Sequence, residues 1–202
     1  PSTTFSLDVI RSLFKYGSNL LFGRLISVLF RNSFYFVIGK FYSAAQLGFY
    51  TRADMFKNLP SNNLASIIRK VSFPIMAKLQ DEPDRLKSGY QKLIRIVMFI
   101  SFLSMFGMAA VAEPMIITLL GKKWLPSAAY LQLLCFSGAL YPLHALNLNI
   151  INVTGRSDLF LRLEIVKKVI LVPVIAVGTF YGIEWMLIGF IITSVVGYFL
   201  NA

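Results

Sequence analysis

Long apolar stretches separated by short polar segments run along the whole chain. A transmembrane helix needs about 20 predominantly apolar residues, and six stretches meet that length. We expect spans at about 14–42, 55–79, 93–120, 126–152, 159–181 and 183–202. The pattern therefore predicts an all-α fold, with residues 1–202 forming a single integral membrane bundle of about six transmembrane helices.

Polar residues mark the expected boundaries of these spans. Ser43 is placed to cap a brief helix after the first span. The charged segment 80–92 has the composition of an aqueous loop, and 155–158 reads as a turn. The pair Glu113-Pro114 predicts a kink in the third span. The second span is unusually polar, so we do not expect lipid on all of its sides.

The composition supports a membrane protein. The hydrophobic fraction is 56%, the charged fraction is 14% and the mean hydropathy is +0.68, against roughly 45–50% apolar and 25% charged residues in soluble domains. The net charge of +11 comes from residues in and beside apolar segments, where the preference for cytoplasmic lysine and arginine accounts for many of them. We therefore expect no nucleic-acid partner.

Few residues are suited to metal or covalent chemistry. Cys135 is the only cysteine and His144 the only histidine, which argues against a disulfide within the chain and against a metal site. We expect both to be core residues of the fourth span. The sequence shows no nucleophile with a base and no phosphate-binding glycine loop. We expect no cofactor and no enzymatic activity.

Orientation follows from the lysine and arginine count in the connections. The side that holds the N-terminus carries more of them than the other side, which predicts a cytoplasmic N-terminus. The chain begins at Pro1 without a methionine, and it stops at Ala202 within an apolar run. We therefore expect it to be a fragment of a longer protein.

The first span carries two arginines among its apolar residues. Each charge at the centre of a membrane helix costs roughly 2.5 to 3.5 kcal/mol on insertion scales. Arg24 and Arg31 are about two helical turns apart, so they lie about 20° apart on one face, to which Tyr35 and Tyr42 return. This stripe is typical of a helix that lines a wet cavity. Lys40 falls on the opposite face near the helix end, where it acts as an anchor.

The stripe has no evident counter-charge within the chain. The acidic residues lie in or near expected loops, as Asp54 does, or toward span ends, as Glu164 does. The missing negative charge is therefore expected to arrive with a ligand, and a planar guanidinium suits bidentate binding of phosphate. The alternative is that the arginines pair with carboxylates elsewhere in the protein or with lipid phosphates.

Three lysines in other spans carry weaker interpretations. Lys57 either extends the polar surface onto the second span or anchors that helix near its outer end, and the sequence favours neither. Lys167 and Lys168 are expected to be anchors of the fifth span.

Four stretches in order along the chain carry a family resemblance. They are AAQLGFYTRAD at 44–54, FPIMAKLQDEPDRLKSGYQK at 73–92, LLGKKWLPSAAYLQLLC at 119–135 and NVTGRSD at 152–158. With this order and spacing, the chain resembles the C-terminal half of bacterial Wzx-type lipid-linked oligosaccharide flippases, in the multidrug/oligosaccharidyl-lipid/polysaccharide exporter superfamily.

The resemblance implies two bundles that face a central cationic cavity in the bacterial inner membrane. Such proteins translocate an undecaprenyl-diphosphate-linked oligosaccharide for surface polysaccharide assembly, by alternating access. The implied partners are that lipid-linked substrate, the bilayer and the missing N-terminal half of the protein. The residues that we expect to bind substrate are Arg24, Arg31, Tyr35, Arg52 and Lys57.

Two other classes of protein stay open at this point. A drug/cation antiporter of the same superfamily would need an acidic residue deep in a span, and no acidic residue is convincingly placed there. An integral membrane enzyme acting on polyprenyl-linked sugars would want a large extramembrane loop with carboxylates or a histidine, and the longest loop here is short.

Overall fold

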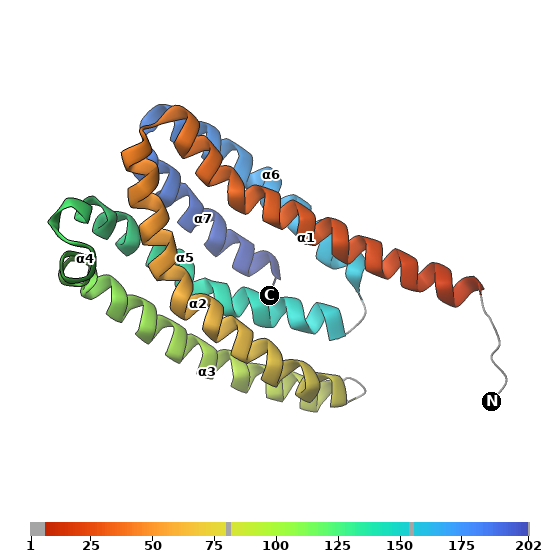
Figure 1. The fold of residues 1–202 in the computed structure, drawn as a ribbon. Coiled ribbons are helices and arrows are strands. Elements are labelled where there is room, and N and C mark those ends of the chain that lie inside the picture. The colour runs from red at the N-terminus through yellow and green to blue at the C-terminus, as the bar shows by residue number, and fades with distance from the viewer. Residues whose placement is uncertain (1–6, 80–81, 154–155, 202) are drawn as a thin grey trace.

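The computed structural model describes residues 7–79, 82–153 and 156–201, and its regular elements are all helices (Figure 1). The expected all-α membrane bundle is confirmed. The elements are α1 (Leu7–Phe41), α2 (Ala44–Lys78), α3 (Pro83–Ala110), α4 (Ala112–Leu120), the short 3-10 helix η1 (Lys122–Trp124), α5 (Pro126–Val153), α6 (Ser157–Tyr181) and α7 (Ile183–Asn201).

The helix α5 lies at the centre of the bundle and packs against α2, α3 and α7. On one side α1 runs alongside α6, and on the other α2 runs alongside α3 (Figure 1). The helices α1 and α2 meet near the turn that joins them and diverge from there. The N-terminal part of α1 extends beyond its neighbours.

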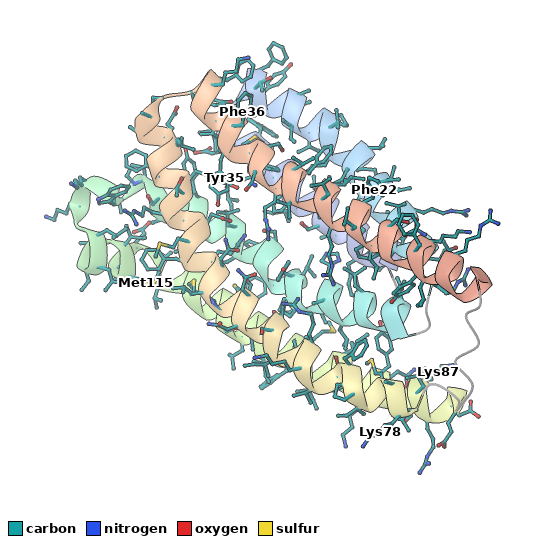
Figure 2. The ribbon with its side chains drawn as sticks, turned by 45° about the vertical axis from the view of Figure 1, so that its right-hand side comes forward. Phe22, Tyr35, Phe36, Lys78, Lys87 and Met115 are labelled. Carbon is teal, nitrogen blue, oxygen red and sulfur yellow. The ribbon has the colours of Figure 1, made fainter. Side chains whose placement is uncertain are left out.

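The outer surface of the bundle is apolar, as expected for contact with lipid. Phe22 and Phe36 are among many large exposed hydrophobic side chains, whereas Tyr35 lies between α1 and α2 (Figure 2). Three helical segments are long and apolar enough to cross a membrane: Leu13–Phe41, Asp84–Ala110 and Ile183–Leu200. The chain is therefore a multi-pass membrane protein, and the count of six spans stays a prediction.

Ser43 caps a helix as predicted, but the helix is long rather than brief. Its hydroxyl accepts the backbone N–H of Gln46, and the Gln46 side chain accepts the backbone N–H of Ser43. The polar segment that follows stays helical because Tyr50, Ala53 and Asp54 pack inside the bundle. The expected brief helix is therefore the first part of α2.

The expected aqueous loop at 80–92 is wrong for most of its length. Helix α3 begins at Pro83, where proline supplies a helical φ and its missing N–H costs nothing. Asp84 in the first turn suits the positive end of the helix dipole. Charge density therefore marked a solvated helix end, which carries Lys87 and lies beside Lys78 of α2 (Figure 2). Residues 80 and 81 lie outside the described part of the chain.

The third expected span is divided rather than kinked at Glu113-Pro114. The break comes at Val111, between α3 and α4. Pro114 falls in the first turn of α4, where its missing N–H is tolerated. Helix α4 ends at Leu120 and is followed by Gly121, whose φ of 91° favours glycine. Of the predicted turn at 155–158, residue 155 lies outside the described residues.

Candidate functional site

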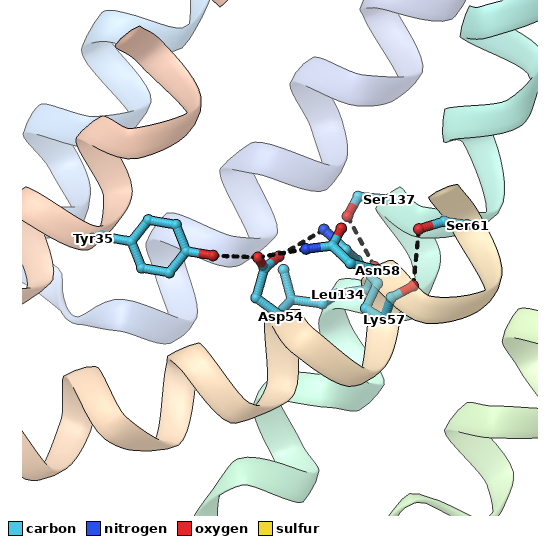
Figure 3. Close-up of polar contacts among 7 residues, drawn as sticks. All are labelled: Tyr35, Asp54, Lys57, Asn58, Ser61, Leu134 and Ser137. Atoms are coloured by element: carbon cyan, nitrogen blue, oxygen red, sulfur yellow. Dashed lines mark hydrogen bonds and ion pairs between the residues drawn. The ribbon is translucent and has the colours of Figure 1, made fainter. Parts of the chain in front are cut away.

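Asp54 of α2 is a buried carboxylate with three partners. It accepts hydrogen bonds from Lys57 Nζ at 2.7 Å, from Asn58 Nδ2 at 2.7 Å and from the hydroxyl of Tyr35 on α1 (Figure 3). The spacings of three and four residues place Lys57 and Asn58 on the same side of α2 as Asp54. We call these four residues the Asp54 cluster.

The Asp54 cluster corrects the expected position of Asp54 and rules out one of the two interpretations of Lys57. Asp54 lies within a helix and is 7% exposed, not in a loop. Lys57 is not an anchor at a helix end, because its side chain is 13% exposed and forms an ion pair with Asp54. Its aliphatic stem passes over Gly138 of α5, where an added Cβ would lie 2.9 Å from Lys57 Cγ. Because residue 138 is a glycine, the Lys57 side chain has room to enter the bundle.

A second buried carboxylate, Glu164 of α6, has a similar set of partners. It accepts a hydrogen bond from Ser27 of α1 and from Lys167 Nζ at 2.6 Å, and Lys168 Nζ lies 3.8 Å away. We call these four residues the Glu164 cluster. Lys167 and Lys168 are therefore not free anchors, and Glu164 is not a span-end residue without a partner. The sequence spacing of Glu164 with lysines three and four residues later was the signal for this pairing.

The two arginines of the α1 stripe differ from its tyrosines. Tyr35 and Tyr42 point into the bundle, where Tyr35 donates to Asp54 and Tyr42 donates to the carbonyl oxygen of Gly178. Arg24 and Arg31 are exposed, and neither forms an ion pair with any residue that the structure describes. The four residues therefore share one face by helical angle, but the arginines are exposed whereas the tyrosines point into the bundle.

The neighbouring face of α1 explains where the arginines lie. Gly23 and Ser27 face α6, since a Cβ at Gly23 would lie 2.4 Å from Phe160 Cε1 and Ser27 bonds Glu164. Arg24 is offset from Ser27 by about 60°. Arg31 is offset by about 40° in the same direction, so both arginines lie to one side of the α1–α6 contact. On α1, Arg31 is four residues after Ser27 of the Glu164 cluster and four before Tyr35 of the Asp54 cluster, so it lies one turn from each.

Arg24 also lies on a largely apolar part of the exposed surface of α1. Leu21, Leu25 and Val28 are exposed beside it. A guanidinium beside such a surface suits an amphipathic ligand that joins an anionic group to a hydrocarbon chain.

The structure does not bring Arg52 together with the other candidates. Arg52 is exposed, and its guanidinium lies over the Trp124 ring of η1, 5.5 Å from the ring centroid. On α2 it is about 140° from Lys57. This arrangement is a surface cation–π contact.

The remaining polar candidates occupy structural positions. Lys40 is exposed, and its Nζ lies 5.8 Å from the Phe36 ring centroid and 5.7 Å from that of Phe41, which fits an anchor. Cys135 is buried in the core as expected. His144 lies within α5, with Nε2 3.2 Å from the carbonyl oxygen of Ser194 on α7. Among the described residues, no group of three or more histidine, cysteine, aspartate or glutamate side chains is placed to hold a metal.

A helical bundle with an apolar outer surface and paired internal charges defines a multi-pass membrane protein. Residues 1–129 match the family described as "Polysaccharide biosynthesis protein", and the chain belongs to that family. The resemblance to Wzx-type proteins seen in the sequence is confirmed.

Curated relatives carry names from the same field. The chain is 30% identical over 159 residues to the teichuronic acid biosynthesis protein TuaB of Bacillus subtilis, a match that covers 79% of this chain and 33% of TuaB. It is 26% identical over 202 residues to the lipopolysaccharide biosynthesis protein WzxC of Escherichia coli, covering 100% of this chain and 41% of WzxC.

A third relative is named as a transport protein. The succinoglycan biosynthesis transport protein ExoT of Rhizobium meliloti is 24% identical over 143 residues, which cover 70% of this chain and 29% of ExoT. The chain thus spans well under half the length of these three relatives. No solved structure matches it.

Proposed function

We propose that this chain is part of a transporter that moves an undecaprenyl-diphosphate-linked oligosaccharide across the bacterial inner membrane for surface polysaccharide assembly. The observation that carries the proposal is the exposed position of Arg24 and Arg31 on α1. Both lie in a helical segment apolar enough to cross a membrane, and neither has a carboxylate partner among the described residues. A charge placed there without a partner is functional by default.

The diphosphate group supplies the missing counter-charge. Arg24 and Arg31 each offer a planar fork of N–H donors, which bind phosphate oxygens in pairs. The apolar surface beside Arg24 accommodates the first part of the polyprenyl chain, while the rest of that chain stays in the bilayer. Tyr35 and Lys57 border this site through the Asp54 cluster. Arg52 acts separately, at the end of α2 where η1 lies.

The rest of the transporter comes from the missing N-terminal half of the same protein. That half would cover the arginine face of α1 and form the opposite wall of the cavity. Alternating access then carries the polar headgroup across as the two halves rock. The names of TuaB, WzxC and ExoT support a role in polysaccharide assembly, and that of ExoT supports transport.

An antiporter would need buried carboxylates. Two are present, but both are already paired with lysines. Asp54 and Glu164 lie inside helices, as a site for an organic cation would require. Each already forms an ion pair with a lysine of its own helix. A cationic drug would have to displace that lysine, so we favour an anionic substrate.

The experiment uses the full-length protein in a strain that lacks its own flippase. The Arg24→Ala/Arg31→Ala variant should abolish surface polysaccharide while the protein still inserts at the normal level. The Arg24→Lys/Arg31→Lys variant should restore export only in part, because an ammonium keeps the charge and loses the fork. Lys40→Ala, which removes an exposed anchor of the same helix, is the matched control. Normal polysaccharide from the double alanine variant at equal protein level would refute the proposal.

A further inference from the structure

The Glu164 cluster contains more positive than negative charge. Glu164 holds Lys167 at 2.6 Å, and Lys168 lies at 3.8 Å from its other carboxylate oxygen. One carboxylate neutralises one ammonium group, so one positive charge is left over. The Lys168 side chain is 20% exposed, which is too buried for a solvated surface lysine.

The surroundings of Lys168 do not supply the second negative charge. Within the described residues, the carboxylate that pairs with Lys168 is that of Glu164, which Lys167 also shares. Helices α1 and α6 run parallel, because Gly23 lies against Phe160 and Ser27 bonds Glu164. Arg31 is one turn beyond Ser27 and Lys168 is one turn beyond Glu164, which places the two cations at the same level. Arg31 increases the local excess of positive charge.

We infer that Lys168 of α6 and Arg31 of α1 together form a binding position for one phosphate group of the lipid-linked diphosphate, with Glu164 as the resident counter-ion that the ligand competes against. This inference rests on the proposed function and deepens it. It assigns a substrate contact to α6, where the sequence had suggested only anchors.

The geometry gives the two cations different tasks. Arg31 is exposed on α1 and meets the ligand first, whereas Lys168 is partly covered and is held on α6 beside Glu164. Because Ser27 of α1 also bonds Glu164, the position spans the contact between α1 and α6. An arriving phosphate adds negative charge at a point where Glu164 satisfies only part of the positive charge.

Competition between Glu164 and the ligand predicts that substitutions of Glu164 and of Lys168 change the affinity for phosphate in opposite directions. Removing the charge of Lys168 weakens phosphate binding. Removing the charge of Glu164 leaves both lysines available and strengthens it. A purely structural ion pair predicts instead that both changes reduce stability and leave affinity alone.

The test measures binding of undecaprenyl diphosphate to purified full-length protein in detergent, together with thermal unfolding. We expect Lys168→Ala to raise Kd about tenfold, as for the loss of one charged hydrogen bond. Lys168→Arg should stay near the wild type, and Glu164→Gln should lower Kd severalfold. Arg162→Ala, an exposed cation of the same helix, is the matched control and should bind as the wild type does.

The outcomes separate this inference from the proposed function. An unchanged Kd in Lys168→Ala, with Arg24→Ala/Arg31→Ala clearly weakened, would overturn this inference and leave the proposed function intact. An unchanged Kd in the double arginine variant would overturn the proposed function itself. Weaker binding in both Glu164→Gln and Lys168→Ala would also overturn the inference, because it contradicts competition.

Discussion

The Asp54 cluster and the arginine face of α1 both place charge in apolar helices, but they balance it differently. Inside the bundle, Asp54 and Lys57 neutralise each other, and Asp54 also accepts a hydrogen bond from Asn58. On α1, Arg24 and Arg31 are exposed and have no ion pair with the described residues. Where a charge serves the fold, the chain supplies its partner. The charges that we assign to a substrate are the ones without a full partner: Arg24 and Arg31, and Lys168, which shares Glu164 with Lys167.

The largest effect on stability is expected in the Asp54 cluster. Asp54→Ala leaves Lys57 buried without its partner, which should lower the free energy of unfolding by about 3–5 kcal/mol. Adding Lys57→Met to that variant removes the orphaned charge and should restore most of the loss. Denaturant titration of the full-length protein in detergent measures both.

Asp158→Ala is the control for this prediction. Asp158 is an exposed carboxylate in the first turn of α6, so its loss should change stability by at most about 1 kcal/mol. Unfolding of Asp54→Ala at the same denaturant concentration as this control would show that the buried pair does not hold the fold.

An intermediate effect is expected beside the arginine face. Gly23 precedes Arg24, yet its Cβ position meets the Phe160 ring at 2.4 Å. Gly23→Ala should therefore push α1 away from α6 and cost about 1–3 kcal/mol of stability. Gly17, with nothing within 4 Å of its Cβ position, is the comparison: Gly17→Ala should stabilise by about 0.5–1 kcal/mol. Equal effects at the two glycines would argue against the close α1–α6 contact.

The smallest effect is expected at Arg52. Its contact with the Trp124 ring is at the surface, and such contacts contribute about 0.5–1 kcal/mol. Arg52→Ala should thus destabilise slightly and should reduce polysaccharide export less than Arg31→Ala does. Export lost as completely as in Arg31→Ala would place Arg52 in the main binding site.

The sequence predicted the fold better than it predicted the charge pairing. Hydrophobic length was sufficient for the helices, because backbone hydrogen bonds in a bilayer must be satisfied within each helix. The charged residues of 80–92 predicted an aqueous loop, but the first turns of α3 lie there and are solvated and helical. Asp54 was expected in or near a loop, although it lies within α2 and faces the core.

The candidate site was predictable only in part, since pairing depends on how helices pack. The angular stripe of Arg24 and Arg31 followed from spacing alone. The hydrogen bond from Tyr35 to Asp54 joins two helices, and no local pattern specifies it. Lys167 and Lys168 were open to a better prediction, because Glu164 lies three and four residues before them. Their proximity to Arg31 needed the structure.

The central claim is that Arg24 and Arg31 receive a lipid-linked diphosphate during transport. The most direct measurement follows a labelled undecaprenyl-diphosphate-linked oligosaccharide across vesicles that contain the purified full-length protein. We predict that Arg24→Ala/Arg31→Ala transports about a hundredfold more slowly than the wild type, with unchanged stability, as for the loss of two charged hydrogen bonds. Transport at the wild-type rate by equal amounts of the double variant would contradict the account.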